Sequence, residues 1–377
     1  MAPRRDQAAG VPAKGGGRVR AEPASFFSRC QRLHCHLAFR PFFLMVIRKK
    51  AHARAGLVGN PSDGYFGKTI SFVIRNFGAE VILYETPELK IEPNERDHSV
   101  FESISHLAKD VRQFGYYGGI RLLKATVKRF ADYCAKEGIE LGGKNFTLRY
   151  ESDVPPQVGM AGSSAIICAC LRALMEFYKV EIPLHEQPNV VLSVENDELG
   201  IPAGLQDRVI QVYEGVVFMD FNRGLMEERG YGNYEPIDPA MLPPLYVAYT
   251  RQLSEGTEIF HNDIRSRWNR GEREIVSAMY HWAGLAERVK EMLLGGRGRD
   301  IGPLLNENFD LRRRLYKISK GNLDMVEAAR SVGASAKFTG SGGAVVGTYE
   351  DEAMYKKLES AFAELGIAVI KPQIVRA

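Results

Sequence analysis

The sequence is poor in cysteine and has no long uninterrupted apolar run. Its five cysteines are odd in number among 377 residues, and Cys134, Cys168 and Cys170 stand in helical patterns. We therefore expect reduced, packed cysteines in a cytoplasmic protein rather than a disulfide framework. The apolar stretch at residues 37–47 is interrupted by Arg40 and is too short to span a bilayer, so no membrane partner is expected.

A strong charge of one sign is also missing, except near the N-terminus. The net charge is +4, but residues 1–50 hold eleven Lys or Arg and two acidic residues, so they carry +9 and the rest carries −5. A mildly acidic body gives no reason to expect nucleic acid as a partner. We interpret residues 1–45 as a basic, disordered tail; a transit peptide, or sequence upstream of a start at Met45, stay open as alternatives.

The P-loop pattern is absent, because no Gly-Lys-Ser/Thr follows the glycine-rich segment at residues 155–165. That segment nevertheless places two glycines and two serines directly before an apolar helix. The first N–H groups of a helix have no partner within it and favour an anion. The segment therefore predicts an anion site built from backbone, although an ordinary glycine turn before a core helix would use the same residues.

Strands and helices are mixed without the regular alternation of a doubly wound sheet, and no internal repeat is evident. The predicted strands cover residues 52–58, 70–76, 79–85, 146–151, 216–221, 245–249, 335–339, 345–348 and 368–374. The predicted helices cover residues 119–135, 165–178, 189–199, 272–294, 301–319, 323–332 and 352–365. This order predicts an α+β fold of two domains, 46–240 and 241–377, with the boundary in a segment of glycine, proline and mixed charge.

Three glycine-containing stretches, at residues 54–64, 155–165 and 337–347, resemble in order and spread the three motifs of the GHMP small-molecule kinases. The resemblance covers residues 50–377. It implies a two-domain GHMP kinase-like architecture, with an N-terminal domain like ribosomal protein S5 domain 2 and a C-terminal ferredoxin-like α/β domain. It also implies ATP as a ligand, with Mg²⁺ as the accompanying cation.

Within this family the first motif, residues 59–63 with the continuation 67–69, looks most like that of plant glucuronokinases. It differs from galactokinases, which have Glu-His-Thr in place of Asn60, Pro61 and Ser62. The resemblance implies transfer of the γ-phosphoryl of ATP to the anomeric hydroxyl of D-glucuronate, giving glucuronate 1-phosphate for UDP-glucuronate synthesis. A kinase for another sugar or polyol, or a non-catalytic ligand sensor on the same fold, are the alternatives.

The resemblance also assigns residues to the nucleotide and the metal. The expected nucleotide-binding residues are Pro155, Gly159, Met160, Ala161, Gly162, Ser163, Ser164 and Ala165. Ser163 and Glu195 are the expected Mg²⁺ ligands, because this ion takes few protein oxygens and leaves its other positions to phosphate and water. Ser164 is an alternative to Ser163, and either serine could instead cap the helix.

Asp207 matches the aspartate that the sugar-kinase and mevalonate-kinase branches place beside the acceptor hydroxyl, and Arg54 matches the basic residue that faces it. The expected roles are acceptance of the hydroxyl proton by Asp207 and stabilisation of charge by Arg54. A surface salt bridge between Asp207 and Arg208 is the plainer explanation of the same sequence.

The acceptor is expected to contact Asp63, whose carboxylate can accept bonds from two sugar hydroxyls. Lys68 and the glycines of the third motif, Gly340, Gly342 and Gly343, complete the expected substrate site. The carboxylate of a uronic acid needs a cation, and Lys68, Arg251 and Arg208 all remain open for that role. The sequence indicates neither the oligomeric state nor the nucleotide preference.

Overall fold

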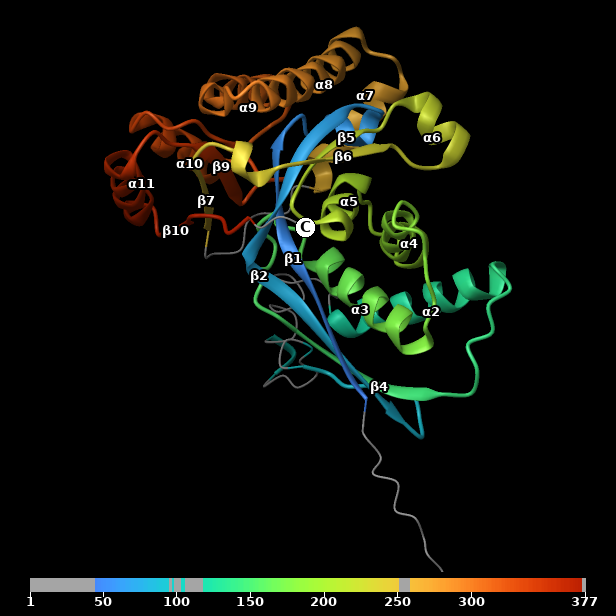
Figure 1. The fold of residues 1–377 in the computed structure, drawn as a ribbon. Helices are drawn as coiled ribbons and strands as arrows, with labels where there is room; N and C mark the ends of the chain where they lie inside the picture. The colour runs from blue at the N-terminus through green and yellow to red at the C-terminus, as the bar shows by residue number, and fades with distance from the viewer. Residues whose placement is uncertain (1–44, 95–96, 98–102, 106–117, 251–257, 375–377) are drawn as a thin grey trace, which may run out of the picture. The chain divides into compact units, whose positions relative to one another are not determined.

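The computed structural model describes residues 45–94, 97, 103–105, 118–250 and 258–374. The predicted tail at residues 1–45 therefore lies outside the described residues except for Met45. The chain from Leu44 to Ala377 forms one compact unit. Figure 1 shows its ribbon, in which two sheets carry helices at their faces.

The first sheet is built around one long strand, β2 (Lys68–Thr86). One edge of β2 pairs antiparallel with β1 (Val46–Val58), and the other edge pairs with β5 (Val216–Asp220) and then with β4 (Asn145–Ser152). The short strands β3 (Lys90–Ile91) and β6 (Asn233–Ile237) complete the sheet.

The strands predicted at residues 70–76 and 79–85 are parts of the single strand β2. The register changes here, because His52 pairs with Gly78 while the next residue, Ala53, pairs with Ile74. Three residues of β2 thus have no partner on β1, as in an irregular β-bulge. The N–H of Arg75, within this bulge, donates instead to the carbonyl of Gln373 near the C-terminus at 3.0 Å.

Helix α3 (Gly162–Tyr178) covers the middle of this sheet, where it packs on β1 and β2 (Figure 1). Its buried residues point in all directions around the helix, which is typical of a core helix rather than an amphipathic one. Helix α2 (Gly119–Lys136) packs against α3 and shields it from solvent with an amphipathic face. This arrangement fixes the N-terminus of α3, and the loop before it, against the sheet.

The remaining helices of this half lie in the segment that follows α3. They are α4 (Gln187–Ser193), the five-residue π-helical turn η2 (Val194–Glu198), α5 (Leu205–Tyr213) and α6 (Arg223–Arg229). The helix predicted at residues 189–199 is therefore divided into α4 and the π turn, which carries Glu195. Such π turns are frequent at functional sites. No helix was predicted at α5, on which Asp207 lies.

The second sheet has the order β10, β7, β9, β8, all antiparallel. Its strands are β7 (Leu245–Thr250), β8 (Lys337–Phe338), β9 (Ala344–Thr348) and β10 (Ile367–Ile370). Its helices are α7 (Glu258–Asn269), α8 (Arg273–Leu294), α9 (Gly302–Leu315), α10 (Lys320–Ser331) and α11 (Glu352–Glu364). Short 3-10 turns occur in both halves of the described chain, at η1 (Ser62–Tyr65), η3 (Pro239–Met241) and η4 (Gly298–Asp300).

The predicted boundary near residue 240 lies between β6, the last strand of the first sheet, and β7, the first of the second. Buried side chains from both sheets and from α8 share one hydrophobic cluster, which contains Phe72, Val247 and Trp282. The indole N–H of Trp282 donates to the carbonyl of Asn308 on α9 at 3.0 Å. The two halves thus share a core, and the division into two domains stays a prediction.

Cys134, Cys168 and Cys170 are free and buried. Burial raises the pKa of each of these thiols, so all three stay protonated and unreactive at neutral pH. Among the described residues, no helix combines the length and apolar character needed to cross a membrane.

Candidate active site

In the loop before α3, every second residue from Gln157 to Ala161 has a positive φ angle. Gln157, Gly159 and Ala161 have φ angles of 57°, 68° and 60°. A backbone that alternates in this way turns successive N–H groups toward one side and forms a concave anion site. Ala161 is the N-cap of α3, and no side chain caps the helix. The first N–H groups of α3 are therefore left without a side-chain cap beside this loop, which suits a phosphate.

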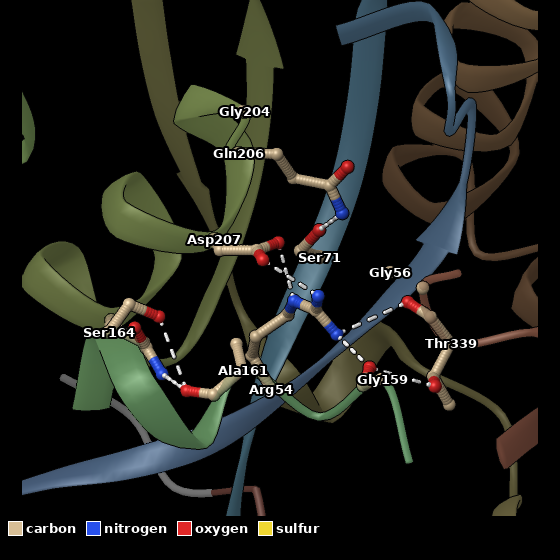
Figure 2. Close-up of polar contacts among 12 residues, drawn as sticks. Arg54, Gly56, Ser71, Gly159, Ala161, Ser164, Gly204, Gln206, Asp207 and Thr339 are labelled. Carbon is tan, nitrogen blue, oxygen red and sulfur yellow. Dashed lines mark hydrogen bonds and ion pairs between the residues drawn. The ribbon is translucent and has the colours of Figure 1, made fainter. Parts of the chain in front are cut away.

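The residues predicted to bind nucleotide divide into two groups by burial. Met160, Ser164 and Ala165 are buried, whereas Pro155, Gly159, Ala161, Gly162 and Ser163 keep partial exposure on the outer side of the loop. The hydroxyl of Ser164 donates to the carbonyl of Ala161 at 3.2 Å, as Figure 2 shows. Ser164 therefore supports the loop from behind, and the partly exposed group is the one available to a ligand.

Arg54 and Asp207 form a bidentate ion pair beside this loop. The Nε of Arg54 is 2.6 Å from Asp207 Oδ1, and its Nη2 is 2.8 Å from Oδ2. The Nη1 of Arg54 donates to the carbonyls of Gly159 at 2.5 Å and Thr339 at 3.5 Å. Figure 2 shows this guanidinium between the carboxylate and the two carbonyls. One side chain thus joins all three glycine-containing stretches to Asp207.

The ionisation of Asp207 follows from this pairing. Burial by itself would raise the pKa of Asp207, but the charge of Arg54 and its hydrogen bonds, with a further contribution from Arg208, hold that pKa below its usual value. The Arg54 side chain is 6% exposed and that of Asp207 is 22% exposed. Asp207 is therefore ionised at neutral pH and keeps one face open to a ligand, so a mere surface salt bridge with Arg208 does not describe it.

Asp63 lies beside this pair, at the start of the turn η1. Its Oδ2 is 2.9 Å from the position that a Cβ on Gly204 would take, so a side chain at residue 204 would collide with the carboxylate. Burial and the negative charge of Asp207 raise the pKa of Asp63 to about 6. The structure thus brings together two carboxylates of different acidity, one ionised and one near its titration point.

Glu195, on the π turn η2, is almost completely buried and is held by two groups. Its Oε1 accepts a hydrogen bond from Ser163 Oγ at 3.0 Å. Its Oε2 accepts from Arg208 Nε at 2.9 Å and also contacts Arg208 Nη2. Arg208 Nη1 is 3.3 Å from Asp207 Oδ2, so Arg208 links the two carboxylates. The structure brings Ser163, and not Ser164, to Glu195.

The glycines of the third motif support the loop of the second. A Cβ on Gly340 would lie 2.7 Å from the carbonyl oxygen of Gly159 and 3.0 Å from Arg54 Nη2, so only glycine allows this approach. Gly342 and Gly343 are buried, and the N–H of Gly343 donates to Asn322 Oδ1 at 2.8 Å. Gly340 therefore faces the site, the carbonyl oxygen of Gly342 lies 2.7 Å from the position of a Cβ on Gly159, and Gly343 is anchored to α10.

Lys68 is not brought to this site as a free cation. Its ammonium contacts the carboxylates of Asp220, at 3.1 Å, and Glu287. Arg208 is likewise paired, with Glu195, and Arg251 lies outside the described residues. A cation that already has carboxylate partners is a poor ligand for the acid group of a substrate, so neither Lys68 nor Arg208 is free for that role, and the identity of the cation stays a prediction.

Two buried basic residues near the site were missed altogether. Arg312 on α9 and Lys337 on β8 are 4% and 1% exposed. The ammonium of Lys337 donates to the carbonyls of Gly56 and Phe338 at 2.7 and 2.6 Å. Lys337 is the first residue of the third motif, so its place in the sequence was a signal that it lies near the site. Arg312 stands in a run of three arginines that resembles an exposed helix face, so no signal distinguished it.

Comparison with known proteins identifies the family. Residues 121–215 match the family model for the GHMP kinases N terminal domain. Over 306 residues the chain is 46% identical to Glucuronokinase 1 of Arabidopsis thaliana, covering 80% of this chain and 84% of that protein. This chain belongs to the GHMP kinases. The resemblance of its three motifs to that family is thereby confirmed.

Solved structures agree on the fold of this GHMP kinase. Lactococcus lactis galactokinase, in complex with galactose, has a TM-score of 0.67 at 14% identity, covering 87% of this chain and 93% of that one. L. major mevalonate kinase, in complex with R-mevalonate, has a TM-score of 0.63 at 18% identity, covering 88% and 98%. The predicted α+β, GHMP kinase-like fold class is confirmed.

Proposed function

We propose that this GHMP kinase transfers the γ-phosphoryl group of ATP to the anomeric hydroxyl of D-glucuronate and releases glucuronate 1-phosphate, the precursor of UDP-glucuronate. The observation that carries the proposal is the ionised carboxylate of Asp207, held by Arg54 at the edge of a backbone anion site. The sugar acid is supported by the 46% identity to a glucuronokinase. The reaction belongs in the cytoplasm, where ATP and reduced cysteines both occur.

The geometry supplies what phosphoryl transfer requires of a protein. The N–H groups of the loop and of α3 hold the phosphates, so the transferred group stays in line with the acceptor. Asp207 accepts a hydrogen bond from the acceptor hydroxyl, orients it, and takes its proton as the new bond to phosphorus forms. Because Arg54 keeps the pKa of Asp207 low, the aspartate is a weak base, and most of its effect comes from orientation.

Ser163 and Glu195 fit a Mg²⁺ ion that accompanies ATP. Their facing oxygens are 3.0 Å apart beside the loop, and both are the hard donors that this ion prefers. In the described part of the chain, no group of three or more His, Cys, Asp or Glu side chains could hold a metal ion, which suits a cation held mainly by phosphate and water. When bound, Mg²⁺ supplies positive charge to the phosphate oxygens.

An acceptor panel tests the proposed function. The purified protein, incubated with ATP and Mg²⁺, is expected to turn over D-glucuronate with a kcat/KM at least about 100-fold above the values for glucose, galactose and mevalonate. Formation of ADP and of an acid-labile sugar 1-phosphate is measured by coupled assay and by ³¹P NMR. Turnover of another acceptor with none of glucuronate would contradict the assignment, and binding without any turnover would favour the sensor alternative.

Activity is expected to depend on pH through Asp63. Since its pKa is raised to about 6, Asp63 accepts bonds from sugar hydroxyls above that pH and carries a proton below it. We expect kcat/KM for the acceptor to fall about tenfold per pH unit below 6, in initial-rate profiles at saturating ATP.

Asp63→Asn, the control, is expected to remove this limb and to raise the acceptor KM at all pH values. Loss of activity at low pH would not come from unfolding through Asp63. Because the pKa of Asp63 is raised in the folded protein, the folded protein binds this proton more tightly than the unfolded chain does. The contribution of Asp63 to stability is therefore present below its ordinary pKa of 3.8 and is lost as the pH rises through 6. A limb that persists in Asp63→Asn would assign it to another group.

A further inference from the structure

Arg312 is a buried cation without an acidic partner. It lies on α9, is 4% exposed, and forms no ion pair with any carboxylate among the described residues. Its Nη1 and Nη2 donate to the carbonyls of Gly340 and Ser341 at 2.9 and 3.4 Å. Carbonyl dipoles satisfy some N–H groups but do not neutralise a full charge, and an uncompensated buried charge is costly.

The position of Arg312 is fixed from two sides of the acceptor site. One helical turn earlier on α9, Asn308 accepts a bond from the N–H of Gly59 at 2.7 Å and donates to the carbonyl of Asn60 at 3.1 Å. The third motif holds the guanidinium itself through the carbonyl of Gly340. Helix α9 therefore contacts the first motif through Asn308 and the third motif through Arg312. These are the two stretches that carry the proposed acceptor-binding residues.

Arg312 lies among other buried charged groups of the site. Arg312 interacts electrostatically with Asp63 and with Lys337, and Lys337 interacts in turn with Arg54. Three buried cations, Arg54, Lys337 and Arg312, thus surround two carboxylates, and one of these, Asp207, is taken by Arg54. Burial, together with the charges of Arg312 and Arg54, lowers the pKa of Lys337 well below its usual value. Lys337 can therefore lose its charge, whereas the arginine Arg312 stays charged and forms no ion pair among the described residues.

We propose that Arg312 binds the carboxylate of the acceptor and thereby sets the specificity for a sugar acid. An anionic group would pair with this buried guanidinium, which can receive a carboxylate through two parallel hydrogen bonds. This inference rests on the proposed function, because it concerns the same acceptor. It replaces the cations suggested by the sequence: Lys68 and Arg208 are both occupied by carboxylates of the protein.

Arg265 on α7 is the competing cation. Its guanidinium lies over the ring of Tyr65 at 4.1 Å, close to Gly64 in the acceptor turn. The Arg265 side chain is exposed, however, and a charge in contact with water interacts more weakly with a bound anion than a buried one does. We therefore assign the carboxylate to Arg312 and use Arg265 as a comparison.

The experiment compares glucuronate with glucose and with the methyl ester of glucuronate, which lack the negative charge. In Arg312→Gln we expect the preference for glucuronate, as a ratio of kcat/KM values, to fall on the order of 100-fold with the KM for ATP unchanged. Arg313→Gln, which removes the neighbouring exposed arginine of the same helix, should leave the ratio intact. Arg265→Gln should reduce it at most a few fold.

Several results would overturn the proposal. They are an unchanged preference in Arg312→Gln, a larger loss in Arg265→Gln, or a raised KM for ATP, which would place Arg312 at the phosphates. If Arg312→Gln fails to fold, Arg312→Lys keeps the charge but not the paired donors, and a preference reduced about tenfold is expected, whereas no reduction overturns the inference.

Calorimetric binding without ATP separates this inference from the proposed function. Glucuronate that binds wild-type protein but not Arg312→Gln supports the role of Arg312 even if another acid is the substrate that turns over. A wild-type protein that turns over glucuronate, with equal binding to the variant, leaves the function standing and removes Arg312 from it. Binding and turnover of neutral sugars alone would overturn both.

Discussion

Asp207→Asn is expected to lower kcat for glucuronate by roughly 10²-fold, the lower end of the range for loss of a general base, because most of the effect of Asp207 comes from orientation. The amide keeps the shape of the carboxylate and can still accept a bond from Arg54, but it carries no charge with which to attract the hydroxyl proton. The affinity for ATP, measured by calorimetry, should stay unchanged because Asp207 lies outside the loop before α3. Single-turnover rates should fall as far as kcat does, since the step affected is chemistry.

Asp324→Asn is the matched control for this variant, because Asp324 pairs with Lys320 on the surface of α10. It should leave kcat unchanged. Asp207→Asn also leaves the buried Arg54 without its charge partner, so urea unfolding must show that the variant is folded at the assay temperature. In Asp207→Asn the pKa of Asp63 should fall part of the way, because burial still raises it but the charge of Asp207 no longer does. A kcat within tenfold of wild type would remove Asp207 from the mechanism.

Glu195→Gln is expected to affect both stability and metal dependence. The Glu195 and Arg208 side chains are 2% and 5% exposed. Burial by itself would lower the pKa of Arg208, but the negative charges of Glu195 and Asp207 have the larger effect and raise that pKa. Removal of one charge from such a buried pair typically costs about 3–5 kcal/mol. We expect a loss of that order in the free energy of unfolding by urea, and a higher Mg²⁺ concentration for half-maximal activity.

Two comparisons separate the effects on stability and on the metal. Glu198→Gln, in the same π turn, removes a more exposed pair with Lys128 and should cost less than about 1 kcal/mol. The double variant Glu195→Gln with Arg208→Gln should regain part of the lost stability, because no unpaired charge is left buried, but it should not regain the affinity for Mg²⁺. Equal destabilisation by Glu195→Gln and Glu198→Gln would show that the buried pair contributes little.

Local patterns in the sequence were enough to predict much of the fold. Helix α3 was predicted from a continuous apolar run, and α8 from regular helical spacing, because both signals depend on nearby residues only. The division of β2 into two strands was wrong, since the irregularity at residues 75–77 arises from pairing with β1 and with the C-terminal segment, both distant in sequence. The π turn η2, which carries Glu195, was likewise not predicted within the helix at residues 189–199.

By itself, the sequence determined the family and the residue types of the site, because glycines, serines and acidic residues at fixed places along the chain carry that information. Only the tertiary structure decided which of them meet. It placed Ser163 rather than Ser164 against Glu195, and it paired Lys68 with the carboxylates of Asp220 and Glu287. It also buried Arg312 while the adjacent Arg313 stays exposed. The reason is physical: burial and charge pairing depend on segments that fold together from distant parts of the chain, and no local pattern records them.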